Sequence, residues 1–366
     1  MNADILIIGA GIIGAACAHE LAAAGLDVLV LDDRRGGATA QGMGHLVVMD
    51  DNPAELALSQ QSLAVWRQWA RQMSSDCAWH PCGTLWLAAN EEEMAAAVEK
   101  KDRLQTHDVT SELIDARSLH TLEPALRAGL HGGLRVPGDS IVYAPNAARW
   151  LLAQHPGRIR VQHSSALEID GTRVRVTGNQ WLQANAIVLA NGIHATQLCP
   201  ELPIRAKKGQ LLITDRYPGQ VHHQLVELSY VTTAHHSTGP SVAFNLQPRP
   251  TGQLLLGSSR QFDDTSNAVD PHMLAQMLQR AVSYVPSLAG LNAIRCWTGL
   301  RAATPDSLPL LGAHPQRPGL WLAVGHEGLG ITTAPASARL LAAQITGSAP
   351  PLDPAPYLPQ RFGAVA

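Results

Sequence analysis

The stretch ILIIGAGIIGAACAHELAAAGLDVLVLDD, residues 5–33, decides the fold. It opens with a short apolar run rich in Ile and continues through G-x-G-x-x-G at residues 9–14. An alanine-rich run then reaches Gly25, and a second apolar run follows at residues 28–31. This order of strand, glycine loop, helix and strand predicts a βαβ unit that binds a dinucleotide. The alternative, a glycine-rich turn without a ligand, leaves the register of the four pieces unexplained.

Each glycine of the motif has a separate predicted role. Gly9 permits the tight turn, Gly11 lets a pyrophosphate approach the backbone, and Gly14 lets the helix pack closely on the strand. The backbone N–H groups at the helix start, at Ile13, then face the phosphates. Such a loop recognises the ADP half of a cofactor, which NAD and FAD share.

Two acidic residues end the second apolar run. Asp32 is predicted to accept hydrogen bonds from the ribose hydroxyls of the cofactor, which disfavours a ribose 2′-phosphate. Asp33 is expected to lie at the same cofactor edge.

The composition limits the class of protein. The chain has 366 residues, of which 46% are hydrophobic and 16% charged, and its formal net charge is -3. These values are typical of a globular protein and give no electrostatic reason to expect a nucleic-acid partner. No C-x-x-C pair occurs, so we expect neither an iron–sulfur cluster nor another metal, and the alternative of a site at Cys77, His80 and Cys82 is weak.

The apolar run at residues 5–18 could be taken for a signal peptide. It has Asp4 in front of it, lacks a basic start, and soon meets His19 and Glu20. No other apolar run is long enough to span a bilayer, so we expect no transmembrane segment and a cytoplasmic protein.

A second strand–turn–helix pattern lies near the C-terminus, in GLWLAVGHEGLGITTAPASARLLAAQITG at residues 319–347. Residues 320–324 predict a strand, and residues 331–345 predict a helix. Between them, the segment Gly328, Leu329, Gly330 and Ile331 would point backbone N–H groups at an anion. A reduced flavin gathers negative charge on one edge of its ring, so this turn favours a flavin over a nicotinamide. An ordinary helix with a flexible entry is the alternative.

With both ends considered, the chain resembles the D-amino acid oxidase superfamily of FAD-dependent amine oxidoreductases, which includes glycine oxidase and sarcosine oxidase. The resemblance implies FAD as cofactor and covers nearly the whole chain. It rests on GGATAQGMGHL (36–46), SSALEID (164–170), ANAIVLANGIHA (184–195) and PIRAKKGQLLIT (203–214). The cofactor contacts that it implies in the first three of these segments are Thr39, Gly42, Met43, Leu167 and Gly192.

The resemblance also implies the architecture. We expect an α/β protein with a discontinuous, Rossmann-like FAD-binding domain and a smaller substrate domain built on an antiparallel sheet. The first comprises residues 1–80, 140–205 and 293–366, and the second comprises residues 81–139 and 206–292. The second sheet is predicted from residues 83–88, 210–214, 229–234, 241–247 and 253–260. The Pro- and Ala-rich segment 349–359 is predicted to be a surface tail.

Arg301 is the principal predicted substrate residue. The resemblance places it over the flavin, where its guanidinium would hold the substrate carboxylate through two parallel hydrogen bonds. A structural salt bridge is the alternative role. Relatives supply a tyrosine from the facing sheet, whereas this chain has Phe244 and Asn245 there, which hints at a more apolar lid.

Two histidines and two lysines are further candidates. His45 lies in the flavin segment and His326 in the C-terminal glycine turn. Each is predicted to be either catalytic or engaged in packing and hydrogen bonding. Lys207 and Lys208 are interpreted as a solvated pair, and the alternative is that they favour superoxide-like charge if oxygen accepts the electrons.

These features predict an enzyme that oxidises a carboxylated amine to its imine by hydride transfer to flavin N5. The segments at 42–51 and 135–151 resemble flavoprotein subunits of D-hydroxyproline dehydrogenase. This resemblance implies D-hydroxyproline or D-proline as substrate and electron transfer to a partner subunit or a quinone. One alternative is a glycine or sarcosine oxidase that releases H2O2, and another is a non-catalytic FAD-binding subunit.

Overall fold

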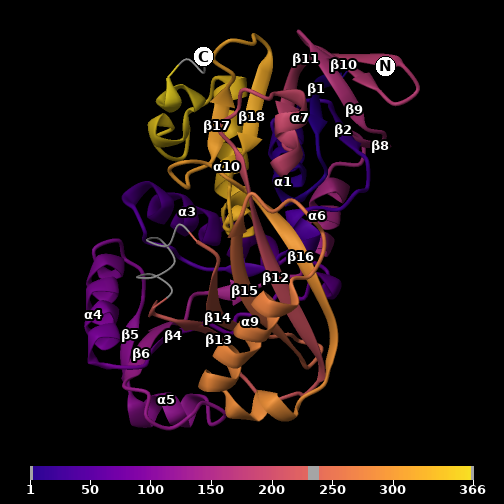
Figure 1. Ribbon diagram of the computed structural model, residues 1–366. Helices are drawn as coiled ribbons and strands as arrows, with labels where there is room; N and C mark the ends of the chain where they lie inside the picture. Colours follow the sequence, from indigo (N-terminus) through magenta and orange to yellow (C-terminus); the bar gives the residue numbers. More distant parts are fainter. Residues whose placement is uncertain (1–2, 230–238, 364–366) are drawn as a thin grey trace.

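Two large sheets, joined by long strands and flanked by helices, make up the protein (Figure 1). The structure is a computed structural model, and it describes residues 3–229 and 239–363. Both sheets have eight strands, so the predicted mixed α/β fold is confirmed.

The first sheet contains the βαβ unit of the N-terminus. Its order is β17-β18-β11-β1-β2-β8, with β9 and β10 as an extension from β11. All neighbours on the main path pair in parallel except β17 and β18. The strands are β1 (Ala3–Ile8), β2 (Val28–Asp32), β8 (Ile159–His163), β9 (Ala166–Asp170), β10 (Arg173–Val176), β11 (Gln180–Leu189), β17 (Leu310–Ala313) and β18 (Leu320–Val324).

Three helices from distant parts of the sequence pack together beside this sheet: α1 (Ile12–Ala23), α3 (Pro53–Ala70) and α10 (Gly330–Thr346). Alanines on α1 are buried, and their small side chains allow α10 to approach closely. The N-terminus of α3 is capped by Asn52, whose side chain accepts a hydrogen bond from the backbone N–H of Glu55 at 2.9 Å.

The second sheet has the order β16-β12-β15-β14-β13-β4-β6-β5. Its pairs are antiparallel except β13 and β4, which run in parallel. One face is covered by α9 (Pro271–Tyr284), where Phe244 stacks on Tyr284 with ring centroids 4.6 Å apart. The strands are β4 (Thr84–Ala88), β5 (Glu112–Asp115), β6 (Gly132–Val136), β12 (Arg205–Arg216), β13 (Gln224–Glu227), β14 (Ser241–Pro248), β15 (Gln253–Phe262) and β16 (Ala293–Ala303).

The remaining elements are short or peripheral. A two-stranded sheet pairs β3 (His45–Leu46) with β7 (Ser140–Ile141). Among the described residues, the other α-helices are α2 (Ala38–Gln41), α4 (Glu91–Gln105), α5 (Ala116–Leu122), α6 (Ala144–Ala153) and α7 (Ala195–Leu198). The 3-10 helices are η1 (Ser75–Cys77), η2 (Gly192–His194), η3 (Pro286–Gly290), η4 (Ala355–Tyr357) and η5 (Pro359–Phe362). In the described part of the chain, no helix is long and apolar enough to cross a bilayer.

Most of the strands predicted for the second sheet form. The strand predicted at 229–234 lies, apart from its first residue, outside the described residues. The structure adds β16, which pairs with β12 along its length, although it lies inside a segment predicted for the nucleotide-binding domain. The domain boundaries stay a prediction.

The predicted surface tail is confirmed for residues 349–356, which are exposed or half-exposed, but the end of the segment packs on the protein. Tyr357 is only 1% exposed, and its hydroxyl donates a hydrogen bond to the carbonyl of Ala54 at 2.6 Å. The ring of Tyr357 buries apolar area, and the hydrogen bond to Ala54 satisfies its hydroxyl. Together these contacts hold the segment on the start of α3.

Candidate functional site

The glycine loop after β1 is as tight as its motif predicts. Gly9 has φ +109, and a Cβ on it would lie 2.7 Å from the carbonyl oxygen of Ala190. A Cβ on Gly14 would overlap the carbonyl oxygen of Gly9. The loop therefore folds against the end of β11, and only glycine permits both the turn and the close packing of α1.

Three segments that the resemblance assigns to FAD meet at this loop. A Cβ on Gly330 would lie 3.9 Å from Cδ1 of Ile13, which brings the C-terminal glycine turn to the start of α1. A Cβ on Gly42 would lie 3.0 Å from Cδ1 of Ile331, so the segment 36–46 meets the same turn. The hydroxyl of Thr39 accepts a hydrogen bond from the backbone N–H of Ile12 at 2.9 Å.

Two helix N-termini are available for an anionic cofactor. The N-cap residues of α1 and α10 are Gly11 and Leu329, and neither makes a side-chain capping hydrogen bond. Neither helix has an acidic residue in its first turn. The N–H of Ile12 is already bonded to Thr39, but the other N–H groups of the first turns and the positive ends of the helix dipoles suit a pyrophosphate at α1 and a reduced ring at α10. The residues present therefore fit FAD.

The acidic residues after β2 lie beside the loop. The carboxylate of Asp32 accepts hydrogen bonds from the backbone N–H of Ala10 at 3.0 Å and of Arg34 at 2.7 Å. The carboxylate of Asp33 instead pairs with the side chain of Arg35 at 2.9 Å. Asp32 is thus the better placed of the two for a cofactor hydroxyl.

The two remaining predicted cofactor residues flank the same edge. Leu167 on β9 is 46% exposed, and it follows a segment that begins with Ser164, whose N–H donates to the carbonyl of Asp32 at 3.1 Å. Gly192 has φ +60 and open space where a side chain would point. Both positions are accessible to a ligand, and their roles stay predictions.

Arg301 lies on the face of the second sheet that is turned toward the nucleotide-binding segments. Its Nη1 donates to the carbonyl of Ser259 at 3.1 Å. A Cβ on Gly209 would lie 2.6 Å from Nη1 and 2.8 Å from Cζ, so the guanidinium lies against the bare backbone of β12. A Cβ on Gly328 would lie 3.7 Å from Cδ of Arg301. The guanidinium is therefore next to the C-terminal glycine turn, and its contact with a substrate carboxylate stays a prediction.

Met43 packs on this same inner face. It forms a small apolar cluster with Leu211 and Leu255. Its carbonyl accepts a hydrogen bond from Nη1 of Arg249 at 3.2 Å. The flavin segment is thereby joined to the second sheet.

The two adjacent lysines are buried, so their interpretation as a solvated pair is wrong. Lys207 is 7% exposed and pairs with Glu327, a residue of the C-terminal turn that the sequence did not single out. Burial alone would raise the pKa of Glu327, but the ammonium of Lys207 brings this pKa below its usual range. Burial also lowers the pKa of Lys207 in spite of that carboxylate. A charged pair thus lies beside Arg301.

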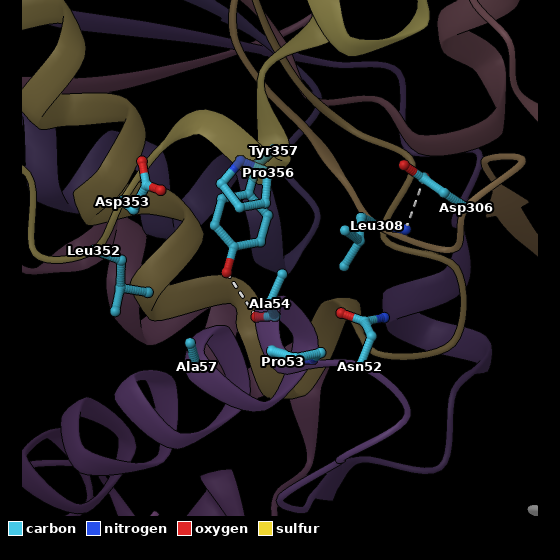
Figure 2. A pocket seen from close by; sticks show the side chains of 10 residues that line it. All are labelled: Asn52, Pro53, Ala54, Ala57, Asp306, Leu308, Leu352, Asp353, Pro356 and Tyr357. Carbon is cyan, nitrogen blue, oxygen red and sulfur yellow. Dashed lines mark hydrogen bonds between the residues drawn. The ribbon is translucent and has the colours of Figure 1, made fainter.

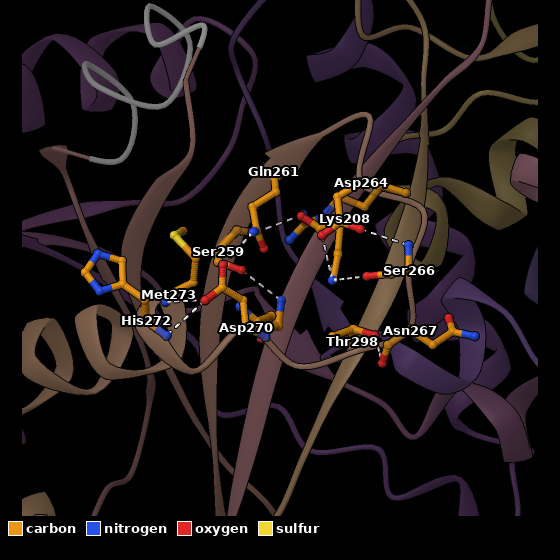
Figure 3. Close-up of polar contacts among 12 residues, drawn as sticks. Lys208, Ser259, Gln261, Asp264, Ser266, Asn267, Asp270, His272, Met273 and Thr298 are labelled. Carbon is orange, nitrogen blue, oxygen red and sulfur yellow. Dashed lines mark hydrogen bonds and ion pairs between the residues drawn. The ribbon is translucent and has the colours of Figure 1, made fainter.

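Lys208 points to the opposite face of the sheet, as alternation along a strand requires. It is 1% exposed, and its Nζ donates to Asp264 at 2.8 Å and to Ser266 at 2.9 Å (Figure 3). Hydrogen bonds to Lys208 and Ser266 lower the pKa of Asp264 to about 2. This contact ties the segment 263–270 to β12 and does not belong to the site.

The two candidate histidines differ in their surroundings. His326 is 8% exposed, and its Nε2 is 3.2 Å from the hydroxyl of Ser337 on α10. Burial lowers the pKa of His326 to about 3, which favours a packing role. Burial lowers the pKa of His45 to about 4, and its Nδ1 is hydrogen-bonded to Gln224. The catalytic role of either stays a prediction.

The expected apolar lid is not formed by Phe244. This side chain is fully buried on the α9 side of the sheet, whereas Asn245, the next residue, faces the opposite, inner side. The Oδ1 of Asn245 is buried and lacks a hydrogen-bond partner among the described residues.

Two other features lie outside this region. In the described residues, Cys199, Glu201 and His314 form a group with metal-ligand chemistry, but the guanidinium of Arg317 donates to the Cys199 sulfur at 2.9 Å. The positively charged side chain of Arg317 thus already lies where a metal ion would bind. An open hollow of about 610 Å3 lies between the start of α3 and the C-terminal segment, where Tyr357 contacts Ala54, and none of the predicted site residues line it (Figure 2).

Comparisons with known proteins agree with this geometry. The sequence profile of a family described as FAD dependent oxidoreductase matches residues 4–344. Glycine oxidase of Pseudomonas aeruginosa is 27% identical over 383 residues, which cover 98% of this chain and 99% of that protein.

Two crystal structures have the same fold. Glycine oxidase from Geobacillus kaustophilus has a TM-score of 0.88 at 24% identity, covering 98% of this chain and 99% of its own. L-proline dehydrogenase from P. horikoshii has a TM-score of 0.89 at 21% identity, covering 99% and 98%. At these identities the structures establish a shared fold.

Proposed function

Because the chain belongs to the DAO family of FAD dependent oxidoreductases, and is thus an FAD enzyme of amine or amino acid oxidation, we propose that its substrate is a D-configured cyclic amino acid, D-hydroxyproline or D-proline. The product is the cyclic imine. The electrons pass to a partner subunit or a quinone.

The observation that carries the proposal is the position of Arg301. Its guanidinium lies between the backbone of Gly209 and the C-terminal glycine turn at Gly328. A planar guanidinium in this place suits a substrate carboxylate held close to a redox-active ring, because two parallel hydrogen bonds fix the orientation of the neighbouring Cα.

The choice of a cyclic substrate rests on the resemblance of two segments, and these segments lie together in the structure. The two segments that resemble D-hydroxyproline dehydrogenase subunits pair with each other through β3 and β7, with His45 opposite Ile141. A Cβ on Gly44 would overlap the carbonyl oxygen of Val142. The two segments thus form one unit beside the inner face of the second sheet.

The chain's own residues define the chemistry around the substrate. When bound, FAD supplies the acceptor for the hydride that leaves the substrate Cα. Arg301 orients the carboxylate, and the pairing of Lys207 with Glu327 neutralises two charges beside it. The substrate nitrogen uses its lone pair to form the C=N bond and releases one proton. Burial lowers the pKa values of His45 and His326, so both imidazoles are neutral, and an amine that arrives neutral needs no side-chain base.

A glycine or sarcosine oxidase that releases H2O2 is the second candidate. The identity to glycine oxidase extends over 98% of the chain, which favours it. The third candidate, a subunit that binds FAD without catalysis, predicts that no amine reduces the flavin.

An anaerobic substrate screen separates the three candidates. Glycine, sarcosine, D-proline and cis-4-hydroxy-D-proline are mixed with the purified flavoprotein, and flavin absorbance is followed. We expect fast bleaching by the cyclic substrates, followed by slow reoxidation in air with little H2O2. Fast bleaching by glycine or sarcosine with stoichiometric H2O2 would favour the oxidase, and no bleaching would favour the scaffold.

A further inference from the structure

Two buried glutamines of the second sheet contact His45. Gln224 on β13 and Gln247 on β14 are both 0% exposed. The Oε1 of Gln224 is hydrogen-bonded to Nδ1 of His45, and the Nε2 of Gln247 lies 3.3 Å from the same nitrogen. The imidazole is therefore held from one side by amides of the sheet.

The orientation of the Gln224 amide follows from its other contacts. Its Nε2 donates to the hydroxyl of Thr84 at 3.2 Å and to the carbonyl of Ser140 at 3.1 Å. Its Oε1 therefore faces His45, and an oxygen can only accept. Nδ1 of His45 must carry the proton in this hydrogen bond.

The Gln247 amide is oriented in a compatible way. Its Oε1 accepts a hydrogen bond from Nη1 of Arg249 at 2.8 Å, so its Nε2 is the end that faces His45. That Nε2 also lies 3.4 Å from the Oε1 of Gln224. This oxygen can accept hydrogen bonds both from Nδ1–H of His45 and from the Gln247 amide. The group that Gln247 turns toward His45 is a donor, so it does not accept the proton on Nδ1.

A neutral imidazole carries a single N–H, so Nε2 of His45 has a bare lone pair. This atom is buried, and no hydrogen-bond donor reaches it from the described residues. A buried acceptor without a donor costs roughly 1–3 kcal/mol, which favours a ligand that supplies a donor.

The position of His45 in the fold indicates which ligand supplies this donor. Its carbonyl accepts a hydrogen bond from the hydroxyl of Thr332, in the first turn of α10, at 2.9 Å. The imidazole thus lies between the helix that begins at the C-terminal glycine turn and the inner face of the second sheet. Arg301 lies on this same face of the sheet, because its guanidinium lies over Gly209 on the side opposite to Lys208.

We propose that Nε2 of His45 accepts a hydrogen bond from an N–H or O–H of the substrate, and that Gln224 is the positioning residue that holds the required tautomer. This inference rests on the proposed function and extends it to specificity. The site recognises the substrate at two points of opposite character, a cation for the carboxylate and a neutral acceptor for a donor group. The donor is either the ring nitrogen or a ring hydroxyl.

The two donor sources are distinguished with a pair of substrates. In His45→Phe, the anaerobic rate constant of flavin reduction divided by substrate Kd should fall roughly 10- to 100-fold. A fall for cis-4-hydroxy-D-proline but not for D-proline assigns the contact to the hydroxyl, and an equal fall for both assigns it to the ring nitrogen. Unchanged values for both would overturn the proposal. The exposed His120 provides the matched control, His120→Phe, which should leave both values unchanged.

The role of Gln224 is tested with Gln224→Glu. A carboxylate beside Nδ1–H stabilises the imidazolium, in which Nε2 carries a proton and can no longer accept. We expect substrate affinity to fall more steeply in this variant than in the wild-type protein as pH decreases from about 8 to 6, because both lose neutral amine but only the variant gains an imidazolium. Identical pH profiles would contradict the positioning role, because a purely structural defect would lower affinity at every pH.

A spectroscopic measurement tests the tautomer without turnover. In 15N-labelled wild-type protein, the histidine signal that disappears in His45→Phe should show a protonated Nδ1 and a bare Nε2. The opposite tautomer would overturn the proposal whatever the activity. Failure of every amine to bleach the flavin would remove the proposed function, whereas bleaching that is equal in His45→Phe and wild-type protein would remove only this inference.

Discussion

The nucleotide-binding junction and the inner face of the second sheet are built by different means. At the junction, the contacts are made by backbone and by the absence of side chains, as at Gly9 and Gly14, where an added Cβ would collide with carbonyl oxygens. On the inner face, the contacts are made by side chains such as Arg301, His45 and Gln224, which come from separate strands. The first region tolerates almost no added atoms, and the second depends on which side chains the strand register brings together.

The largest expected effect concerns the first region. In Gly14→Ala, the new Cβ would overlap the carbonyl of Gly9, so α1 must move away from the loop at a cost of about 3 kcal/mol. The purified variant should lose almost all bound FAD, measured as flavin absorbance per protein, and its thermal midpoint should fall. Gly157→Ala, where a Cβ meets nothing within 4 Å, should retain the cofactor. Full FAD content in Gly14→Ala would show that the loop accepts an added methyl group, contrary to the steric argument.

The second region should lose substrate binding and keep its cofactor. Arg301→Ala removes the predicted carboxylate contact, and losing one partner of a hydrogen-bonded charge pair costs about 2–5 kcal/mol. We expect kcat/KM to fall roughly thousandfold with unchanged FAD content. A variant with normal kcat/KM would assign Arg301 a structural role instead.

Gly209→Ala should have a smaller effect. It tests in the second region whether an added Cβ is tolerated, as Gly14→Ala does in the first. The new Cβ would lie 2.6 Å from Nη1 of Arg301, so the guanidinium must shift by a few tenths of an ångström or more. We expect KM for the carboxylated substrate to rise roughly tenfold while kcat changes less. Gly290→Ala, which has open space, is the control, and equal KM values in the two variants would contradict the contact.

The smallest effect is expected away from both regions, at Lys208. Lys208→Met removes the hydrogen bonds to Asp264 and Ser266 and should lower the free energy of unfolding by about 1–3 kcal/mol, with unchanged kinetics. Because the folded-state pKa of Asp264 is lowered to about 2, its stabilisation is complete above the ordinary value and is lost as pH falls through about 2. Urea unfolding at pH 7, 4 and 2.5 checks this, and the variant should lose less stability on acidification than the wild-type protein.

Several elements could be predicted from the sequence because their determinants are local. The βαβ unit and the strand–turn–helix that leads into α10 each depend on residues within one or two turns of chain. Pattern and capping residues encode such elements directly. The family could be identified for the same reason, since its motifs are short segments.

Other features could not be predicted because neighbouring residues on a strand point to opposite faces. Phe244 packs under α9 while Asn245 faces the site, and Lys208 is buried on the side opposite to Lys207. Which face is which depends on the pairing partners, and these lie far away in the chain. The same dependence explains why Glu327 and Gln224 gave no sequence signal.

The amino-acid sequence alone therefore determined that an ADP-containing cofactor binds at the N-terminal loop, because the glycine spacing satisfies a steric condition within a few residues. The tertiary structure alone decided the character of the substrate side. His45 and Gln224 are 179 residues apart, and Arg301 and Gly209 belong to different strands of one antiparallel pair. Their contacts depend on strand register, a long-range property that the packing of the whole sheet determines.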